Sequence, residues 1–155
     1  MADKSISYAY KLLGIRDYFK NELYEKVKSK FGHEQAEIAV DYMASHGYVD
    51  DERTAYNYAR NKLAAGYGPY YISNKLYLKG CEMDVSSIEK ICEKENISME
   101  EHILRYSKRY IKKNSDDPYK DYIKCLNFLK NKGYSPALVM QIIKKEDFII
   151  WKLFF

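Results

Sequence analysis

The sequence predicts an all-α protein made of three tandem three-helix repeats that form an elongated, curved body. Apolar residues recur every three or four positions, the alternation of a β-strand is nowhere sustained, and Pro and Gly residues stand where helices would begin and end. A weak repeat of about 50 residues, marked by turns at Gly32, Gly80 and Gly133, groups the helices by threes.

The first repeat is predicted over residues 1–50. Its helices are predicted over 5–16, 19–31 and 34–46. The apolar positions of the second helix are four residues apart, at Phe19, Leu23, Val27 and Phe31. This spacing places them on one face of a helix. Gly47 suits the left-handed residue that follows the end of the third helix.

The second repeat is predicted over residues 51–97. Its helices are predicted over 51–65, 69–79 and 84–95. Asp50 and Asp51 lie at the start of the first of these helices. We expect one of them to cap its free N–H groups and both to favour the positive end of its dipole, rather than to form a catalytic carboxylate pair. Pro69 follows Gly68 and suits the first position of the next helix, because its missing N–H costs nothing there.

The third repeat is predicted over residues 98–147, followed by an apolar tail at 148–155. Its helices are predicted over 99–114, 118–132 and 136–146. Ser98 and Glu101 have the spacing of a capping box. Asp117-Pro118 and Ser135-Pro136 each place a capping residue before a proline. The sequence leaves open whether the tail is packed.

The composition is that of a globular, mildly basic protein, with 46% apolar residues and a net charge of +4. Such a charge permits nucleic-acid or acidic protein partners without requiring them. Residues 98–147 hold most of the excess, with eleven basic and seven acidic side chains. No apolar run approaches the ~20 residues of a membrane span, so no membrane partner is expected.

The sequence offers little for catalysis or metal binding. The three cysteines have no paired spacing and the three histidines lie far from them, so we expect reduced thiols and a cytoplasmic protein without a metal or other cofactor. His33 and His46 are interpreted as surface or capping residues. Because no Ser or Cys has a nearby histidine with an orienting partner, we expect a protein that is not an enzyme.

The stretch from Arg53 to Gly80 contains six tyrosines, five basic residues and no acidic residue. A merely solvated surface usually mixes the two signs of charge. We therefore predict a positive, tyrosine-bearing surface suited to DNA phosphate or an acidic protein groove. Its candidate partner-binding residues are Arg53, Arg60, Tyr70, Tyr71, Lys75 and Lys79. A second basic set, predicted to line the helix at 99–114 and to bind nucleic acid, is Lys108, Arg109, Lys112 and Lys113.

Residues 47–80 resemble the central motif of the RecX family, regulators of the bacterial recombinase RecA. The matching residues are Gly47, Tyr48, Asp50, Asp51, Ala55, Tyr58, Gly66, Gly68, Pro69, Ile72, Leu76, Lys79 and Gly80. The chain departs from the family pattern at Tyr70 and Tyr71, where basic residues are common. It also departs at Phe19, where a small hydroxylated cap is usual, so we expect Asp17 or water to cap that helix.

The resemblance implies three tandem three-helix repeats and no catalysis. It also implies binding in the helical groove of the RecA–DNA filament, with inhibition of RecA as the usual outcome. We further expect weak binding to single-stranded or double-stranded DNA, and a monomer. Two alternatives stay open at this point. One is a stand-alone helical DNA-binding protein, since three-helix units are similar to helix-turn-helix modules. The other is a helical-repeat scaffold for a different partner.

Overall fold

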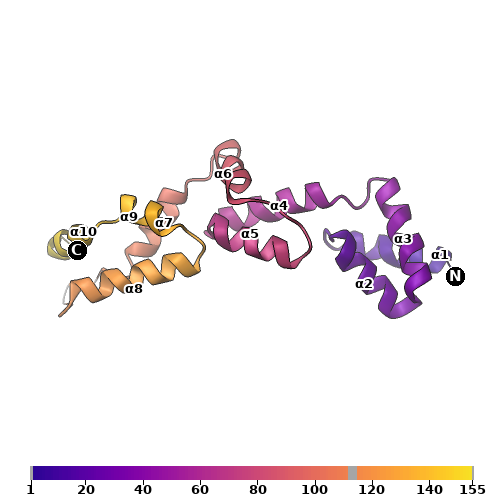
Figure 1. Cartoon of the computed structure of the whole chain (residues 1–155), viewed down its shortest axis with the longest axis horizontal. Helices are drawn as coiled ribbons and strands as arrows, with labels where there is room; N and C mark the ends of the chain where they lie inside the picture. The colour runs from indigo at the N-terminus through magenta and orange to yellow at the C-terminus, as the bar shows by residue number, and fades with distance from the viewer. Residues whose placement is uncertain (1, 112–114, 155) are drawn as a thin grey trace. The chain divides into compact units, whose positions relative to one another are not determined.

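The computed structural model describes residues 2–111 and 115–154, with side chains at 4–111 and 115–150. These residues are all-helical, as predicted, and contain ten α-helices and no β-strand (Figure 1). The helices are α1 (Ala2–Leu13), α2 (Lys20–Phe31), α3 (His33–Ser45), α4 (Asp51–Ala64), α5 (Pro69–Leu78), α6 (Val85–Lys94), α7 (Met99–Ser107), α8 (Pro118–Asn131), α9 (Pro136–Ile142) and α10 (Lys145–Phe154). None of the described helices is long and apolar enough to cross a lipid bilayer.

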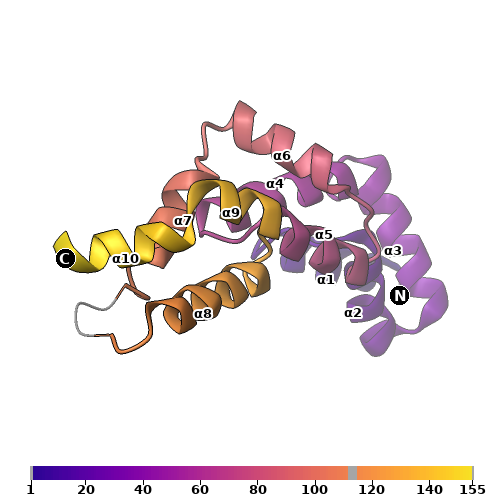
Figure 2. The same cartoon turned by 60° about the vertical axis from the view of Figure 1, so that its left-hand side comes forward.

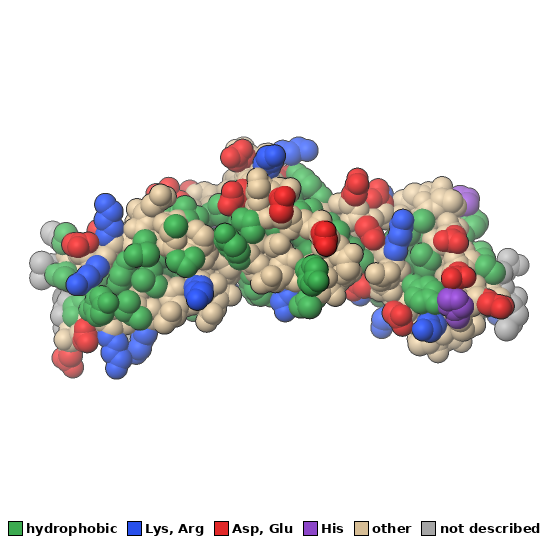
Figure 3. All heavy atoms as spheres, viewed as in Figure 1, with side chains coloured by type: hydrophobic (Ala, Val, Ile, Leu, Met, Phe, Trp, Pro, Cys, Tyr) green, Lys and Arg blue, Asp and Glu red, His purple; other side chains and the backbone are tan. Residues whose placement is uncertain are grey.

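The chain divides into two compact units, and α4 and α5 each contribute to both. Unit 1 contains Met1–Tyr58 and Leu76–Glu82, and unit 2 contains Ala59–Lys75 and Met83–Phe155. The boundaries of the three predicted repeats stay a prediction. In Figure 3, charged side chains of both signs are spread over the visible face, with hydrophobic side chains between them.

Unit 1 has a core in which α3 packs against α1 and α2. The buried residues of this core are Ala9, Tyr18, Leu23, Val27, Ala36, Ala39, Val40, Met43 and Val49. Leu23 and Val27 come from the predicted apolar face of α2, which is therefore confirmed as a buried face. Gly47 has a φ of 73°, a left-handed conformation that favours glycine, and it ends α3 as predicted.

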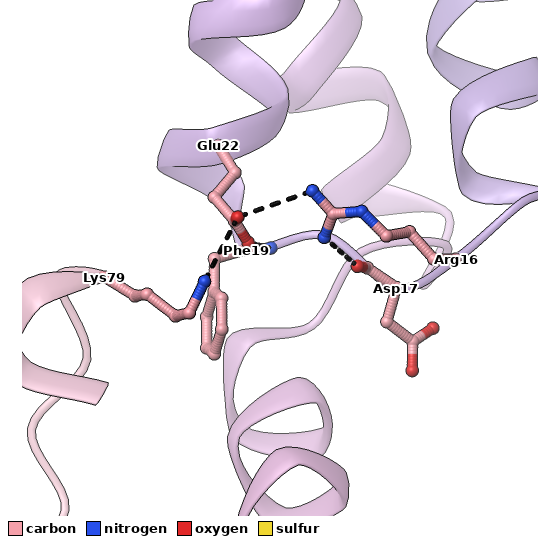
Figure 4. Close-up of polar contacts among 5 residues, drawn as sticks. All are labelled: Arg16, Asp17, Phe19, Glu22 and Lys79. Atoms are coloured by element: carbon pink, nitrogen blue, oxygen red, sulfur yellow. Dashed lines mark hydrogen bonds and ion pairs between the residues drawn. The ribbon is translucent and has the colours of Figure 1, made fainter. Parts of the chain in front are cut away.

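The start of α2 is capped differently from the prediction of Asp17 or water. The N–H of Phe19 donates to Glu22 Oε1 at 3.1 Å, and the N–H of Lys20 donates to Asp51 Oδ1 at 2.8 Å. Asp17 contributes only its main-chain oxygen, which accepts a hydrogen bond from the guanidinium of Arg16 (Figure 4). The bond to Asp51 could not be predicted from the sequence, because it joins residues of two helices that lie 31 residues apart.

Unit 2 has a core centred on α8, which packs against α7, α9 and α10 (Figure 2). The buried residues of this core are Ile103, Tyr106, Tyr122, Cys125, Leu129, Tyr134, Val139, Ile143 and Phe148. Phe148 belongs to the predicted apolar tail, yet it is only 2% exposed and its ring meets that of Tyr122 edge-on at 5.5 Å. The described residues of the tail therefore extend a packed helix, α10.

The predicted capping residues are confirmed where the cap lies two or three residues from its donor. Asp50 accepts hydrogen bonds from the N–H groups of Glu52 and Arg53, which supports capping over catalysis. The caps of α7, α8 and α9 are Ser98, Asp117 and Ser135. Each accepts a hydrogen bond from the N–H group three residues later, the usual geometry of an N-cap.

Three helices end three or more residues earlier than predicted. The first, predicted over 5–16, begins at Ala2 and ends at Leu13. The helix predicted over 99–114 ends at Ser107, whose buried hydroxyl donates to the Leu104 carbonyl at 2.7 Å. The N–H groups of Arg109 and Tyr110 then bond three residues back, as in a tightening last turn. The helix predicted over 136–146 ends at Ile142, because Ile143 is extended and buried in the core.

Candidate nucleic-acid and partner interface

Two turns that are far apart in the sequence are joined by hydrogen bonds in unit 2. The N–H of Gly68 donates to the Lys132 carbonyl at 2.7 Å, and the N–H of Tyr70 donates to the Gly133 carbonyl at 3.0 Å. The Tyr134 hydroxyl, on a side chain only 1% exposed, donates to the Gly66 carbonyl at 2.7 Å. Together these three bonds fix the turn before α5 against the turn before α9.

Both turns need glycine where they cross. A Cβ on Gly68 would lie 2.3 Å from the Gly133 carbonyl carbon, and a Cβ on Gly133 would lie 2.4 Å from the Cβ of Tyr71. Gly133 also has a φ of 102°, which other residues rarely adopt. The Gly-Pro turn of the sequence therefore serves close backbone contact as well as the start of a helix.

The crossed turns bring tyrosine rings and lysines together. The rings of Tyr67 and Tyr71 stack with centroids 4.4 Å apart and an interplanar angle of 24°. The Nζ of Lys132 lies 4.3 Å from the Tyr67 centroid, and that of Lys62 lies 5.2 Å from it. The Nζ of Lys75 lies 5.4 Å from the Tyr71 centroid. We call these five residues the tyrosine–lysine platform.

Lys75 and Lys132 give the platform its positive charge. No carboxylate of the described residues forms an ion pair with Lys75 or Lys132. Lysine ammonium groups within about 6 Å of an aromatic face are attracted to it, so the rings hold the cations without neutralising them. Stacked rings beside unneutralised cations can pack against nucleobases and attract phosphates, which is the arrangement that single-stranded nucleic acids bind.

Comparison with known proteins identifies the family. No family model matches the chain. The chain is 32% identical over 148 residues to the regulatory protein RecX of Thermotoga petrophila, covering 93% of this chain and 85% of that protein. It is 29% identical to the regulatory protein RecX of Legionella pneumophila, covering 95% of this chain and 99% of the relative.

The chain belongs to the RecX family. Its fold is similar to that of a solved RecX from Lactobacillus salivarius, with a TM-score of 0.76 and 20% identity, over 94% of this chain and 96% of that one. Another crystal structure of a regulatory protein RecX aligns with a TM-score of 0.71 and 22% identity, over 92% of this chain and 71% of that one. The resemblance seen in residues 47–80 is thereby confirmed.

In this RecX-family chain, only part of the predicted partner-binding set belongs to the platform. Tyr71 and Lys75 are in it. Tyr70 is 52% exposed and lines a different cleft, beside α6 and α7. Arg60 is half-buried on α4. The adjacent tyrosines therefore serve two surfaces, because successive side chains on a helix point in different directions.

The other two predicted cations, Arg53 and Lys79, are held within unit 1. The guanidinium of Arg53 donates two hydrogen bonds to the Gly47 carbonyl, both at 3.3 Å. Lys79 forms an ion pair with Glu22 Oε2 at 3.5 Å, and Arg16 meets the same oxygen at 3.5 Å (Figure 4). These contacts support the end of α3 and the start of α2, so both cations stabilise unit 1.

The second basic set does not lie along a helix as predicted. Lys108 and Arg109 are exposed but follow the end of α7, and Lys112 and Lys113 lie outside the described residues. The guanidinium of Arg109 lies 5.3 Å from the Tyr106 centroid, and Lys132 lies 5.4 Å from the same centroid. Arg109 and the platform residue Lys132 therefore lie near the same ring, so Arg109 adds a positive charge beside the platform.

Sequence reasoning did not include Tyr67, Lys62 and Lys132 in the site. One signal could have found Lys132. Lys79-Gly80 and Lys132-Gly133 are equivalent pairs in the weak internal repeat, each at the end of a helix. The contact of Lys132 with Tyr67 has no local signal, because it depends on the packing of two distant turns.

The described residues contain no group of three or more His, Cys, Asp or Glu side chains that could hold a metal ion. The thiols are poor nucleophiles. Burial raises the pKa of Cys92 to about 11, with Glu89 and Glu93 adding to the effect, and burial alone raises that of Cys125 to about 12. Both thiols stay protonated near neutral pH.

Proposed function

We propose that this chain is a non-enzymatic regulator that binds the RecA–DNA filament in its helical groove and lowers the recombinase and ATPase activities of RecA. The observation that carries the proposal is the tyrosine–lysine platform, found in a member of a family of regulatory proteins. Its two stacked rings and three lysines offer a surface for DNA without any catalytic group.

The mechanism we propose is occupancy. The chain lies along the groove and bridges successive RecA subunits, so it obstructs strand exchange and slows nucleotide hydrolysis. The platform supplies contacts to DNA that do not read its sequence. Stacking of a base on an aromatic ring contributes about 1–3 kcal/mol. Each phosphate neutralised on a single strand adds about 0.7 to the slope of log affinity against log salt.

The predicted residues divide between two partners in this proposal. The set that contacts the RecA–DNA filament is Arg53, Arg60, Tyr70, Tyr71, Lys75 and Lys79, of which Tyr71 and Lys75 belong to the platform and contact its DNA. The set that contacts nucleic acid is Lys108, Arg109, Lys112 and Lys113. Because Arg53 and Lys79 also stabilise unit 1, Lys75 is the better residue to test for binding alone.

A second candidate function is stand-alone DNA binding. It is favoured by the platform itself, because stacked tyrosines with lysines are suited to single-stranded DNA whether or not RecA is present. The two functions differ in one measurable respect. A filament regulator binds RecA-coated DNA more tightly than bare DNA, whereas a stand-alone binder prefers bare DNA or binds both equally.

The test measures the affinity of the purified chain for fluorescent single-stranded DNA, with and without RecA, at several salt concentrations. RecA ATPase activity is followed in parallel. The variant Lys75→Glu with Lys132→Glu should bind at least tenfold more weakly, lower the salt slope by about 1.4, and inhibit the ATPase less. The charge-matched control, Lys11→Glu with Lys26→Glu, should behave like the unchanged chain.

Three results would count against these proposals. Equal affinity for bare and RecA-coated DNA would favour the stand-alone function. An unchanged ATPase rate at saturating protein would contradict inhibition. Equal losses in the platform variant and in its control would show that total charge, and not the platform, determines binding.

A further inference from the structure

Unit 2 also contains a cleft of about 560 Å³ that the DNA-binding proposal does not use. It is lined by the beginning of α5, the second half of α6, the segment between α6 and α7, and the beginnings of α7 and α9. The volume is in the range of pockets that bind small ligands or inserted side chains. None of the platform residues lines it.

The interior of the cleft is apolar. Cys92, only 5% exposed, lies in its wall, and the half-buried side chains of Ile97, Met99 and Leu138 surround it. The exposed ring of Tyr70 borders the opening. An aliphatic group that enters this space would move from water into contact with carbon and sulfur atoms, which is favourable.

The edge of the cleft is acidic. Glu89 and Glu93 lie four residues apart on α6 and share one face of that helix. Both are exposed, and no cation of the described residues forms an ion pair with either. Their charges reach the interior, since both carboxylates help to raise the pKa of the Cys92 thiol. Figure 3 shows both acidic and basic side chains over α6, with hydrophobic ones beside them.

The helix ends at the cleft do not make it an anion site. The N–H of Glu101 is bonded to the Ser98 hydroxyl, and the N–H of Leu138 to the Ser135 hydroxyl. The N–H of Tyr70 is bonded to the Gly133 carbonyl. The positive ends of the helix dipoles weaken the attraction for a cation, but each carries only about half a charge, opposed by two full carboxylate charges.

We propose that this cleft binds a segment of a partner protein that presents a lysine or arginine beside an aliphatic side chain. The aliphatic group enters the apolar interior, and the cation lies between Glu89 and Glu93. Charge complementarity selects this occupant, because DNA would be repelled by the same two carboxylates. The proposal goes beyond DNA binding, and it does not depend on the platform.

The test uses the full chain labelled with ¹³C in its methionine and isoleucine methyl groups. It is titrated at low salt with three capped pentapeptides, Ala-Leu-Arg-Leu-Ala, Ala-Phe-Arg-Leu-Ala and Ala-Leu-Lys-Leu-Ala. At least one peptide should shift the methyl signals of Met99 and Ile97, and raising the salt concentration should weaken its binding. The matching peptide with Glu in the basic position should produce no shift.

The variant Glu89→Gln with Glu93→Gln should weaken peptide binding by roughly five- to tenfold, as expected for two exposed ion pairs. The control, Glu25→Gln with Glu34→Gln, makes the same change of charge on exposed positions of unit 1 and should bind like the unchanged chain. Circular dichroism checks that both variants keep their helix content.

Four outcomes would overturn the proposal: no shift of Met99 or Ile97 with any peptide at millimolar concentration, equal binding of the acidic peptide, unchanged affinity in the Glu89 and Glu93 variant, or the same loss in the control. Binding to RecA-coated DNA is measured separately. If the cleft does not bind the peptides, the DNA-binding proposal is unaffected. If the chain does not bind DNA, the proposal for the cleft is likewise unaffected.

Discussion

Replacement of Gly68 by Ala should separate the two crossed turns of unit 2. The new Cβ would lie 2.3 Å from the Gly133 carbonyl carbon and 2.6 Å from the Tyr134 nitrogen. Relief to an ordinary contact requires a backbone shift of roughly 1 Å, and the atoms in the way cannot rotate aside as a side chain would. Gly68 does not have a positive φ, so this clash is the main effect of the substitution.

The cost follows from the hydrogen bonds that the shift would break. Three bonds join the turns, from Gly68 to Lys132, from Tyr70 to Gly133 and from Tyr134 to Gly66. Each contributes about 0.5–1.5 kcal/mol, so the free energy of unfolding should fall by about 2–4 kcal/mol. For a chain of this length, that loss lowers Tm by roughly 6–12 °C.

The assay is a thermal melt followed by circular dichroism at 222 nm. Gly14→Ala is the matched control, because its Cβ would meet nothing nearer than the Lys11 carbonyl oxygen at 3.4 Å. The control should change stability by no more than about 1 kcal/mol. If Gly68→Ala melts within 2 °C of the control, the turns are not packed at the described distance and the argument fails. DNA affinity should fall together with Tm, because the same turns assemble the platform.

Other residues give three further predictions. Glu22→Ala removes the acceptor of the Phe19 N–H and two ion pairs, so urea denaturation should show a loss of about 1–2 kcal/mol; an unchanged midpoint would refute the cap. Burial lowers the pKa of His102, so the unfolded chain takes up its proton at higher pH than the folded one; stability should fall as the pH drops below about 6.5, and His102→Gln should flatten that part of the profile. At pH 8 a thiol reagent should modify Cys81 first, with Cys92 and Cys125 reacting only on unfolding. Rapid modification of Cys92 and Cys125 in the folded protein would contradict the burial of these two thiols.

The sequence was most informative where the interaction is local. Asp50 and Ser98 were predictable as caps because each bonds to an N–H group within three residues. The left-handed glycines were predictable for the same reason, since a positive φ is a property of one residue. The all-α class followed from the sum of such local signals.

The platform could be predicted only in part, since one of its five residues, Lys132, comes from a distant segment. Tyr71 and Lys75 belong to the acid-free stretch that was recognised from sequence. Lys132 lies beside these residues only because the two crossed turns pack together. The early end of α7 was missed because a buried serine hydroxyl competes for a main-chain carbonyl, and burial is set by the tertiary fold. The bond from the Lys20 N–H to Asp51 was not predictable for the same reason, since its donor lies in another helix.

The ion pair between Glu22 and Lys79 affects the order in which unit 1 is completed during synthesis. Unit 1 includes Leu76–Glu82, so the ribosome must synthesise part of unit 2 before the last piece of unit 1 appears. At about 5–20 residues per second, that piece follows Tyr58 by roughly one to five seconds. During this interval the nascent α1–α3 lacks the Lys79 ammonium group that pairs with Glu22 at the start of α2, so unit 1 reaches full stability only after α5 has left the exit tunnel.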